Sequence, residues 1–232
     1  MAGVITHMVI AREIIKLLPE NTIVDQGLFY LGNLAPDAIH ARADYERAYK
    51  KHTHFRDDIL DMEFGQEDNL AIFHGRLIDF INDNKGRKDG LLDLYRGYVV
   101  HILTDELFML TVRKEFCALM EEQGIAQNDK RFFEYIVTDM NRNDLLLVEN
   151  YEGSSEIRHL MEEVPIYPIE NYLSKQEIEI SRDWLIHRHF IEAHESLEPR
   201  FISYERNWQF IQMAVVSIIE KLTKGDCFPT IL

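Results

Sequence analysis

The sequence contains little glycine, proline or cysteine. Of 232 residues, 11 are glycine and 6 are proline. No stretch therefore resembles a long flexible linker, and no low-complexity tract or internal repeat is visible. The two cysteines, Cys117 and Cys227, are too few for a disulfide framework. Because 46% of the residues are hydrophobic, the chain can bury a large core. We predict a single domain over residues 1–232.

Long hydrophobic runs are also missing. No run approaches the roughly 18 apolar residues that a membrane-spanning helix needs. The first twenty residues carry Arg12, Glu13 and Lys16 among helically spaced apolar residues. They lack the basic leader and the unbroken hydrophobic core of a signal peptide. We therefore expect a cytoplasmic protein with no transmembrane segment.

Positive charge is scarce. The chain has 40 acidic and 25 basic residues, which gives a formal net charge of −15. Such a charge repels the phosphate backbone of nucleic acids and anionic membrane surfaces. We expect no extended nucleic-acid partner. A small phosphorylated or phospholipid substrate stays compatible with this charge, because bound cations can reverse the local field inside a pocket.

Apolar residues recur at three-and-four spacing along most of the chain, whereas the period-two alternation typical of strands is not sustained anywhere. This pattern predicts an all-α fold. Clusters of Pro, Gly and Asn separate the periodic segments. The segment Pro165–Pro168 is the best internal boundary, but it is too short and too hydrophobic for a domain linker. The predicted helices cover residues 4–18, 67–84, 88–122, 128–150, 175–196 and 199–222.

The stretch GYVVHILTDELF, residues 97–108, carries two polar residues on an apolar helix face. At helical period, His101 and Asp105 lie on the stripe formed by Leu94, Tyr98, Phe108 and Val112. A buried carboxylate needs a compensating charge with hydrogen bonds, or a metal ion. Two ligand-type residues one turn apart can share one cation. A structural hydrogen bond between His101 and Asp105 is the alternative, because so short a motif often occurs by chance.

Other ligand-type residues precede this stretch. His7 lies on the apolar face of the first predicted helix. Asp37 follows the break GNLAP, where it could point into a cleft or cap the next helix. His52 and His54 lie in KHTHFRDD, near the start of another expected helix. Three imidazoles and two carboxylates form a mixed nitrogen and oxygen set that suits zinc or a similar cation, and a carboxylate can bridge two ions. This set comprises His7, Asp37, His54, His101 and Asp105.

The ordered motifs THMVIA, GNLAPDA, THFRDD and GYVVHILTDELF resemble those of the zinc-dependent phospholipase C family. That all-helical family in turn resembles the fungal zinc-dependent single-strand nucleases. The resemblance covers about residues 2–112, and its specificity lies in the order and number of the motifs. It implies that His7, Asp37, His54 and His101 bind zinc and that Asp105 is a bridging carboxylate. The His-Phe pair in the third motif selects His54 over His52.

Two departures from the family pattern affect the predicted metal site. Secreted members of these families use their processed N-terminus as a metal ligand. Here, removal of Met1 would expose the amine of Ala2 close to His7, so Ala2 is a further candidate ligand. The family also draws ligands for a third zinc from histidines that follow the HxxxD motif. No histidine occurs between His101 and His159, so we expect one or two ions rather than three.

Further histidines and aromatic residues are weaker candidates. His40, His52 and His74 lie near the proposed ligands in sequence, and we predict that they line the substrate pocket. Aromatic residues such as Trp184 and Phe133 are expected to pack in the core.

The sequence therefore predicts a metal-dependent hydrolase of a phosphoester, with a phosphodiester as the favoured substrate. By the resemblance, this could be a phospholipid cleaved at its head group. Bound ions would lower the pKa of a water and offset charge on the leaving oxygen. Asp37 could be a ligand or the catalytic base. Two alternatives stay open: a zinc-dependent nuclease-like enzyme, and a non-catalytic helical protein with a structural metal. A His-Asp phosphohydrolase is disfavoured, because the sequence has no adjacent His-Asp pair.

Overall fold

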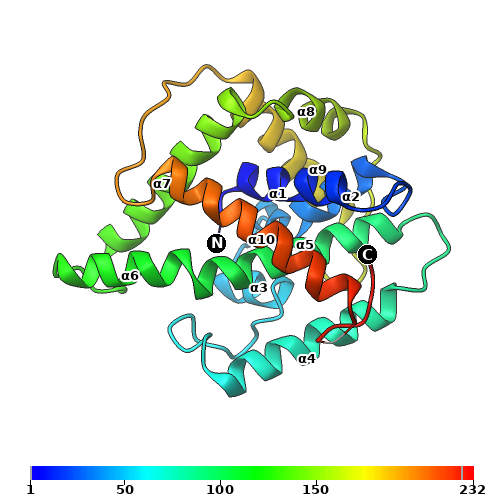
Figure 1. Ribbon diagram of the computed structural model, residues 1–232, viewed down its shortest axis with the longest axis horizontal. Helices are drawn as coiled ribbons and strands as arrows, with labels where there is room; N and C mark the ends of the chain where they lie inside the picture. The colour runs from blue at the N-terminus through cyan, green and yellow to red at the C-terminus, as the bar shows by residue number, and fades with distance from the viewer. Residues whose placement is uncertain (1, 226) are drawn as a thin grey trace.

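Helices account for the regular structure of the chain, as the sequence predicted. The computed structural model describes residues 2–225 and 227–232, and strand pairing within these residues is limited to a single bridge between Ile169 and Leu173. None of the described helices is long and apolar enough to cross a membrane. The helices are α1 (Val4–Leu17), α2 (Gln26–Leu34), the 3-10 helix η1 (Ala35–Ala41), α3 (Arg47–Thr53), α4 (Glu67–Asn84), α5 (Leu92–Leu110), α6 (Val112–Glu122), α7 (Lys130–Asn150), α8 (Ser154–Glu163), α9 (Lys175–Ile186), the π-helical turn η2 (His187–Ile191) and α10 (Tyr204–Thr223) (Figure 1).

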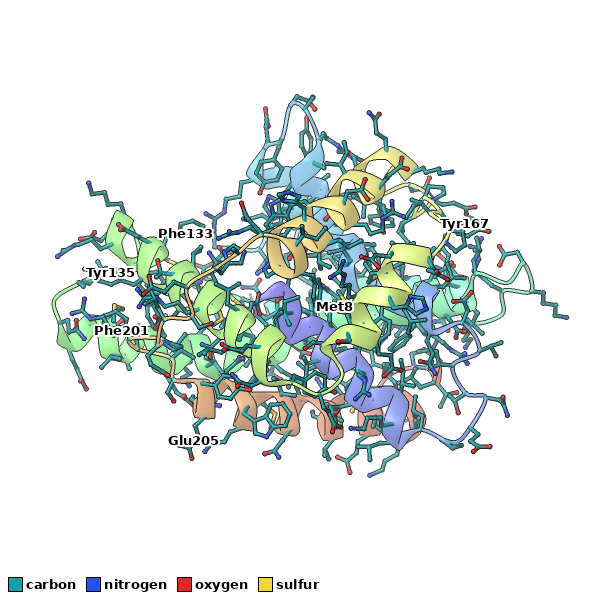
Figure 2. The ribbon with its side chains drawn as sticks, turned by 90° about the horizontal axis from the view of Figure 1, so that it is seen from above. Met8, Phe133, Tyr135, Tyr167, Phe201 and Glu205 are labelled. Atoms are coloured by element: carbon teal, nitrogen blue, oxygen red, sulfur yellow. The ribbon has the colours of Figure 1, made fainter. Side chains whose placement is uncertain are left out.

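Helix α1 runs through the middle of the molecule and packs against α2, α5, α7 and α10 (Figure 1). Its residues 5–11 are all buried, so neighbours surround its first two turns. Figure 2 shows Met8 of this helix in the interior. The first and last helices meet here, because Asn207 of α10 donates a side-chain hydrogen bond to the Thr6 hydroxyl of α1. Polar residues on α1 consequently lie in the core.

Helices α2 and α5 pack closely against each other. It depends on two glycines, since a Cβ atom at Gly32 would collide with the carbonyl oxygen of Leu94, and one at Gly97 would collide with that of Phe29. Glycine lets two backbones approach to a distance that any side chain would prevent. The packing places the backbone of Asn33, at the end of α2, directly against α5.

Helices occupy all six predicted segments, but three of the segments differ from the observed helices. The segment 88–122 is two helices, because Thr111 leaves the helical conformation and its hydroxyl donates to the Leu107 carbonyl oxygen. The segment 175–196 leaves the α-helix after Ile186 and continues only as the turn η2. The segment 199–222 begins at Tyr204, because the Ser203 hydroxyl caps the helix there.

Helices α2, η1, α3 and α8 were not predicted. Residues 27–34 of α2 are all buried, so they show no alternation between an apolar and a polar face. Helix α3 and η1 have seven residues each, which is too short for a periodic pattern to stand out.

The glycine contact between α2 and α5 predicts a large effect of Gly97→Ala. We expect a loss of about 2 kcal/mol or more in the free energy of unfolding, because the new methyl group must displace backbone. Gly75→Ala is the matched control: Gly75 lies in the middle of α4 with nothing near its Cβ position, and alanine there should be neutral or stabilising by up to about 1 kcal/mol. Urea unfolding measures both. Equal midpoints for the two variants would contradict the close packing.

Candidate metal centre

The predicted ligands come from four segments that the fold brings together. His7 lies on α1, Asp37 in the first turn of η1, His54 at the C-terminal cap of α3, and His101 and Asp105 on α5. They form two groups that share His101, and within each group the candidate ligand atoms lie within 4.8 Å of one another. The groups are His7, His101 and Asp105, and Asp37, His54 and His101.

Two sequence interpretations change at this point. The His52 and His54 pair lies at the end of a helix, because α3 stops at Thr53, and not near the start of one. Asp37 does not cap a helix, because η1 begins after Leu34 and the Asp37 carboxylate accepts a hydrogen bond from Lys50. The cleft interpretation of Asp37 therefore fits the structure better than the capping one.

The carboxylate of Asp105 lies between the two groups. Its Oδ2 atom is 3.5 Å from His54 Nε2 and 3.9 Å from His101 Nε2. Its Oδ1 atom is 3.3 Å from His7 Nε2, although the two do not have hydrogen-bond geometry. The ring of His7 stacks on that of His101, with centroids 3.9 Å apart. Asp105 is thus placed to contact both groups at once.

Backbone carbonyls fix the protonation of two imidazoles. His101 Nδ1 lies 2.7 Å from the Asn33 carbonyl oxygen, and His54 Nδ1 lies 2.9 Å from that of Lys50. A carbonyl oxygen can only accept, so each Nδ1 carries the proton and each Nε2 presents a lone pair. This is the arrangement by which outer hydrogen bonds orient metal-ligating histidines.

The Nε2 atoms of His54 and His101 are consequently acceptors, and they face carboxylate oxygens, which are acceptors too. His54 Nε2 lies 3.3 Å from His101 Nε2 and 3.3 Å from an Asp37 oxygen. Lone pairs and carboxylate oxygens at these distances repel one another unless a positive charge lies among them. The Lys50 ammonium supplies such a charge beside Asp37, and a bound cation would supply one between the two imidazoles.

Unpaired buried atoms support the same conclusion. Both ring nitrogens of His7 and the Oδ2 atom of Asp105 are buried without a hydrogen-bond partner among the described residues. Unpaired buried polar groups are costly and are uncommon in folded proteins. The separation of 3.9 Å between His101 Nε2 and Asp105 Oδ2 is too long for a hydrogen bond, which disfavours a simple structural pair. The described residues therefore form a group that could hold a metal ion.

The electrostatics of the cluster keep the ligands in their metal-binding forms. Burial lowers the pKa of His54 and, more strongly, that of His101, so both imidazoles are neutral. Burial opposes ionisation of Asp37, but the Lys50 ammonium holds the pKa of that carboxyl well below its usual range. The pKa of Asp105 is also held well below its usual range despite burial.

Ala2 lies beside the cluster. Its backbone nitrogen donates a hydrogen bond to Asp105 Oδ1 at 3.2 Å. With Met1 attached this nitrogen is an amide, which donates hydrogen bonds but is a poor metal ligand. The role of a free Ala2 amine stays a prediction.

A cavity of about 470 Å³ opens beside the cluster. Asp37, His40 and Lys50 line one part of it, and apolar residues of α7 and α9 line another. Phe133 and Trp184 belong to that apolar part and are 64% and 52% exposed, so the prediction that they pack in the core was wrong. Figure 2 shows Phe133 away from the interior. The helix faces that carry these two residues line the cavity, and no other described helix covers them.

The three histidines predicted to line the pocket have different surroundings. His40 lines the cavity. His52 is exposed and its Nδ1 atom lies 2.9 Å from Asp57, whereas His74 Nε2 lies 2.7 Å from Glu106. Neither is among the residues that line this cavity. Closeness in sequence was the sole basis for both. His52 lies only two residues before His54, so the two side chains point to different sides of α3, and His74 lies on another helix, α4.

Two cavity residues escaped the sequence analysis. Lys50 lies one turn before His54 on α3. Asp144, on α7, accepts hydrogen bonds from the Thr6 backbone nitrogen at 3.0 Å and the Thr6 hydroxyl at 3.2 Å. Burial raises the pKa of Asp144 to about 6. The signal for Asp144 was its place on a helix face with Ile136 and Met140, the same kind of signal that identified Asp105.

Comparisons of the chain with models of known families, with curated proteins and with solved structures found no match. The resemblance to the zinc-dependent phospholipases therefore stays an expectation drawn from the motifs.

The cluster predicts that His54→Ala or His101→Ala removes at least one equivalent of bound metal and leaves the protein helical. Each change deletes a nitrogen that faces the other ligands. His52→Ala is the matched control, because His52 is exposed and faces Asp57. Elemental analysis of unchelated protein measures metal content, and circular dichroism measures helicity. Full metal content in both ligand variants would remove His54 and His101 from the site.

The raised pKa of Asp144 predicts a pH-dependent stability in chelator-treated protein. An unfolded aspartate has a pKa near 3.8, so between pH 3.8 and about pH 6 the folded chain binds more protons than the unfolded chain. The free energy of unfolding therefore falls as the pH rises through this window. Asp144→Asn can still accept from Thr6. It should be more stable than the wild type above about pH 6, by as much as about 3 kcal/mol, with a gap that closes towards pH 4. Urea unfolding at several pH values measures the gap, and a gap that does not change with pH would refute the shift.

Proposed function

We propose that the chain is a metal-dependent hydrolase of phosphoesters, with zinc as its metal and a phosphodiester as its preferred substrate. The observation that carries the proposal is the cluster of acceptor atoms beside a cavity. A zinc ion held there would polarise a phosphoryl oxygen and lower the pKa of a water.

The position of the cluster favours a catalytic over a purely structural metal. Structural zinc sites have four protein ligands, whereas catalytic sites use three and keep an open position. Asp37, His54 and His101 make one group of three, and Asp37 lines the cavity. Substrate in the cavity would lie next to this group. Because Asp37 Oδ1 lies only 3.3 Å from His54 Nε2, we assign Asp37 as a ligand rather than as the base.

The lining of the cavity bears on the substrate. A cationic Lys50 at one side suits an anionic phosphoryl group, and the apolar residues of α7 and α9 suit an apolar substituent. A phospholipid combines both features, which agrees with the motif resemblance. Exposed Phe133 and Trp184 could also stack on a nucleobase, as in a nuclease-like enzyme. The net charge of −15 disfavours long polynucleotides, so a short dinucleotide is the appropriate probe of that alternative.

Asp105→Asn separates a metal-binding role from a structural one. Asparagine keeps the size and one acceptor oxygen of aspartate but removes the charge that offsets the dication, so zinc content and phosphodiesterase turnover should both collapse. If Asp105 only orients His101, the amide still accepts, and the main effect is a stability loss of about 1–3 kcal/mol. Elemental analysis, thermal unfolding and a panel of chromogenic phosphomonoesters and phosphodiesters distinguish the two cases.

The panel should include a phosphatidylcholine and a dinucleotide, so that lipid and nucleotide diesters are compared directly. Asp79→Asn, on the exposed face of α4, is the matched control and should keep both zinc and turnover. Zinc-loaded wild-type protein that hydrolyses no member of the panel would argue for the structural-metal alternative. Full zinc occupancy and unchanged turnover in Asp105→Asn would reject Asp105 as a ligand.

A further inference from the structure

Lys50 is a buried lysine at the edge of the candidate metal site. The residue is 6% exposed, and its ammonium nitrogen lies 2.6 Å from Asp37 Oδ1 and 3.1 Å from His40 Nε2. All three side chains line the cavity. A buried ammonium group requires a counter-charge and hydrogen-bond acceptors. In the described structure, Asp37 supplies the counter-charge and His40 a second acceptor.

The same Asp37 oxygen faces the metal group. Asp37 Oδ1 is the atom that lies 3.3 Å from His54 Nε2. A dication held by Asp37, His54 and His101 would share this oxygen with the Lys50 ammonium, and the two positive charges repel. One dication also offsets the charges of Asp37 and Asp105. Metal binding would therefore leave the Lys50 ammonium without a full counter-charge, at a position that borders the cavity.

An anion in the cavity would restore the balance. An ammonium group has three N–H donors. His40 can accept one of them, since burial lowers the pKa of that imidazole and the nearby Lys50 charge lowers it further. A metal ion bound to Asp37 would weaken the hydrogen bond from a second Lys50 N–H to that carboxylate. Lys50 would then have an N–H donor free on the cavity side.

We propose that Lys50, oriented by His40, forms an oxyanion subsite that binds a phosphoryl oxygen of the substrate once metal has engaged Asp37. The inference rests on the proposed phosphoester chemistry and adds a residue that the motifs do not contain. It makes binding of metal and of anion cooperative, because each relieves the charge imbalance that the other creates.

Calorimetric titration of inorganic phosphate into wild-type and Lys50→Met protein tests the subsite without relying on turnover. Zinc-loaded wild type should bind phosphate, and chelator-treated wild type should bind it at least about tenfold more weakly, because its Lys50 stays paired with Asp37. Zinc-loaded Lys50→Met should keep its zinc, measured by elemental analysis, and lose about tenfold to a hundredfold in phosphate affinity, the usual effect of removing a hydrogen bond to a charged group. Lys50→Arg keeps the charge and should recover part of the affinity.

Lys85→Met is the matched control, because Lys85 is an exposed lysine at the end of α4, and its phosphate affinity should equal that of the wild type. His40→Ala is a second variant in case Lys50→Met fails to fold. It removes the acceptor that orients Lys50, so phosphate affinity should fall several-fold with zinc retained.

Unchanged phosphate affinity in the folded Lys50 or His40 variant would overturn the subsite, and so would equal phosphate affinity with and without zinc. Loss of zinc from Lys50→Met would also overturn it, because Lys50 would then serve to position Asp37 as a ligand. A separate result bears on the proposed function alone. If phosphate binding depends on both zinc and Lys50 but no phosphoester is hydrolysed, the subsite stands and the hydrolase proposal fails.

Discussion

The close approach of α2 and α5 at Gly32 and Gly97 is the constraint on which the candidate site depends. It brings the Asn33 carbonyl oxygen to within 2.7 Å of His101 Nδ1, which fixes the proton on Nδ1 and turns the Nε2 lone pair towards the other ligands. The 3-10 helix η1 follows α2 without a break, so the same packing also positions Asp37. A backbone contact between two helices thus determines both the tautomer of one ligand and the place of another.

The cluster that results is unfavourable by itself. It gathers the Asp105 carboxylate and three imidazoles in the core, with the half-buried Asp37 carboxylate at the edge, and several of these atoms have no donor facing them among the described residues. Lys50 relieves part of this imbalance at the cavity side by pairing with Asp37. A divalent cation would relieve the rest, and in doing so would free Lys50 for an anion. On this account, charge balance links metal binding and substrate binding in one small volume of the protein.

The parts of the site that the sequence revealed were those that break a pattern. Asp105 and His101 were found because two polar residues interrupt an apolar helical stripe, and His7 was found in the same way. Lys50 was missed because charged residues are expected in a polar segment such as ERAYKKHTH, and only the fold shows that this one is buried. The exposure of Trp184 was missed because periodicity predicts which residues share a face, and does not predict whether another helix covers it.

The central claim is that the acceptor cluster binds a divalent metal. Anomalous diffraction at the zinc edge, from crystals of zinc-loaded protein, tests it most directly because it locates the ion without reference to activity. We expect an anomalous peak within bonding distance of His54 Nε2, His101 Nε2 and a carboxylate oxygen of Asp37 or Asp105, or a peak between His7 and Asp105, or both. A map with no peak at either group, in crystals soaked at saturating zinc, would contradict it.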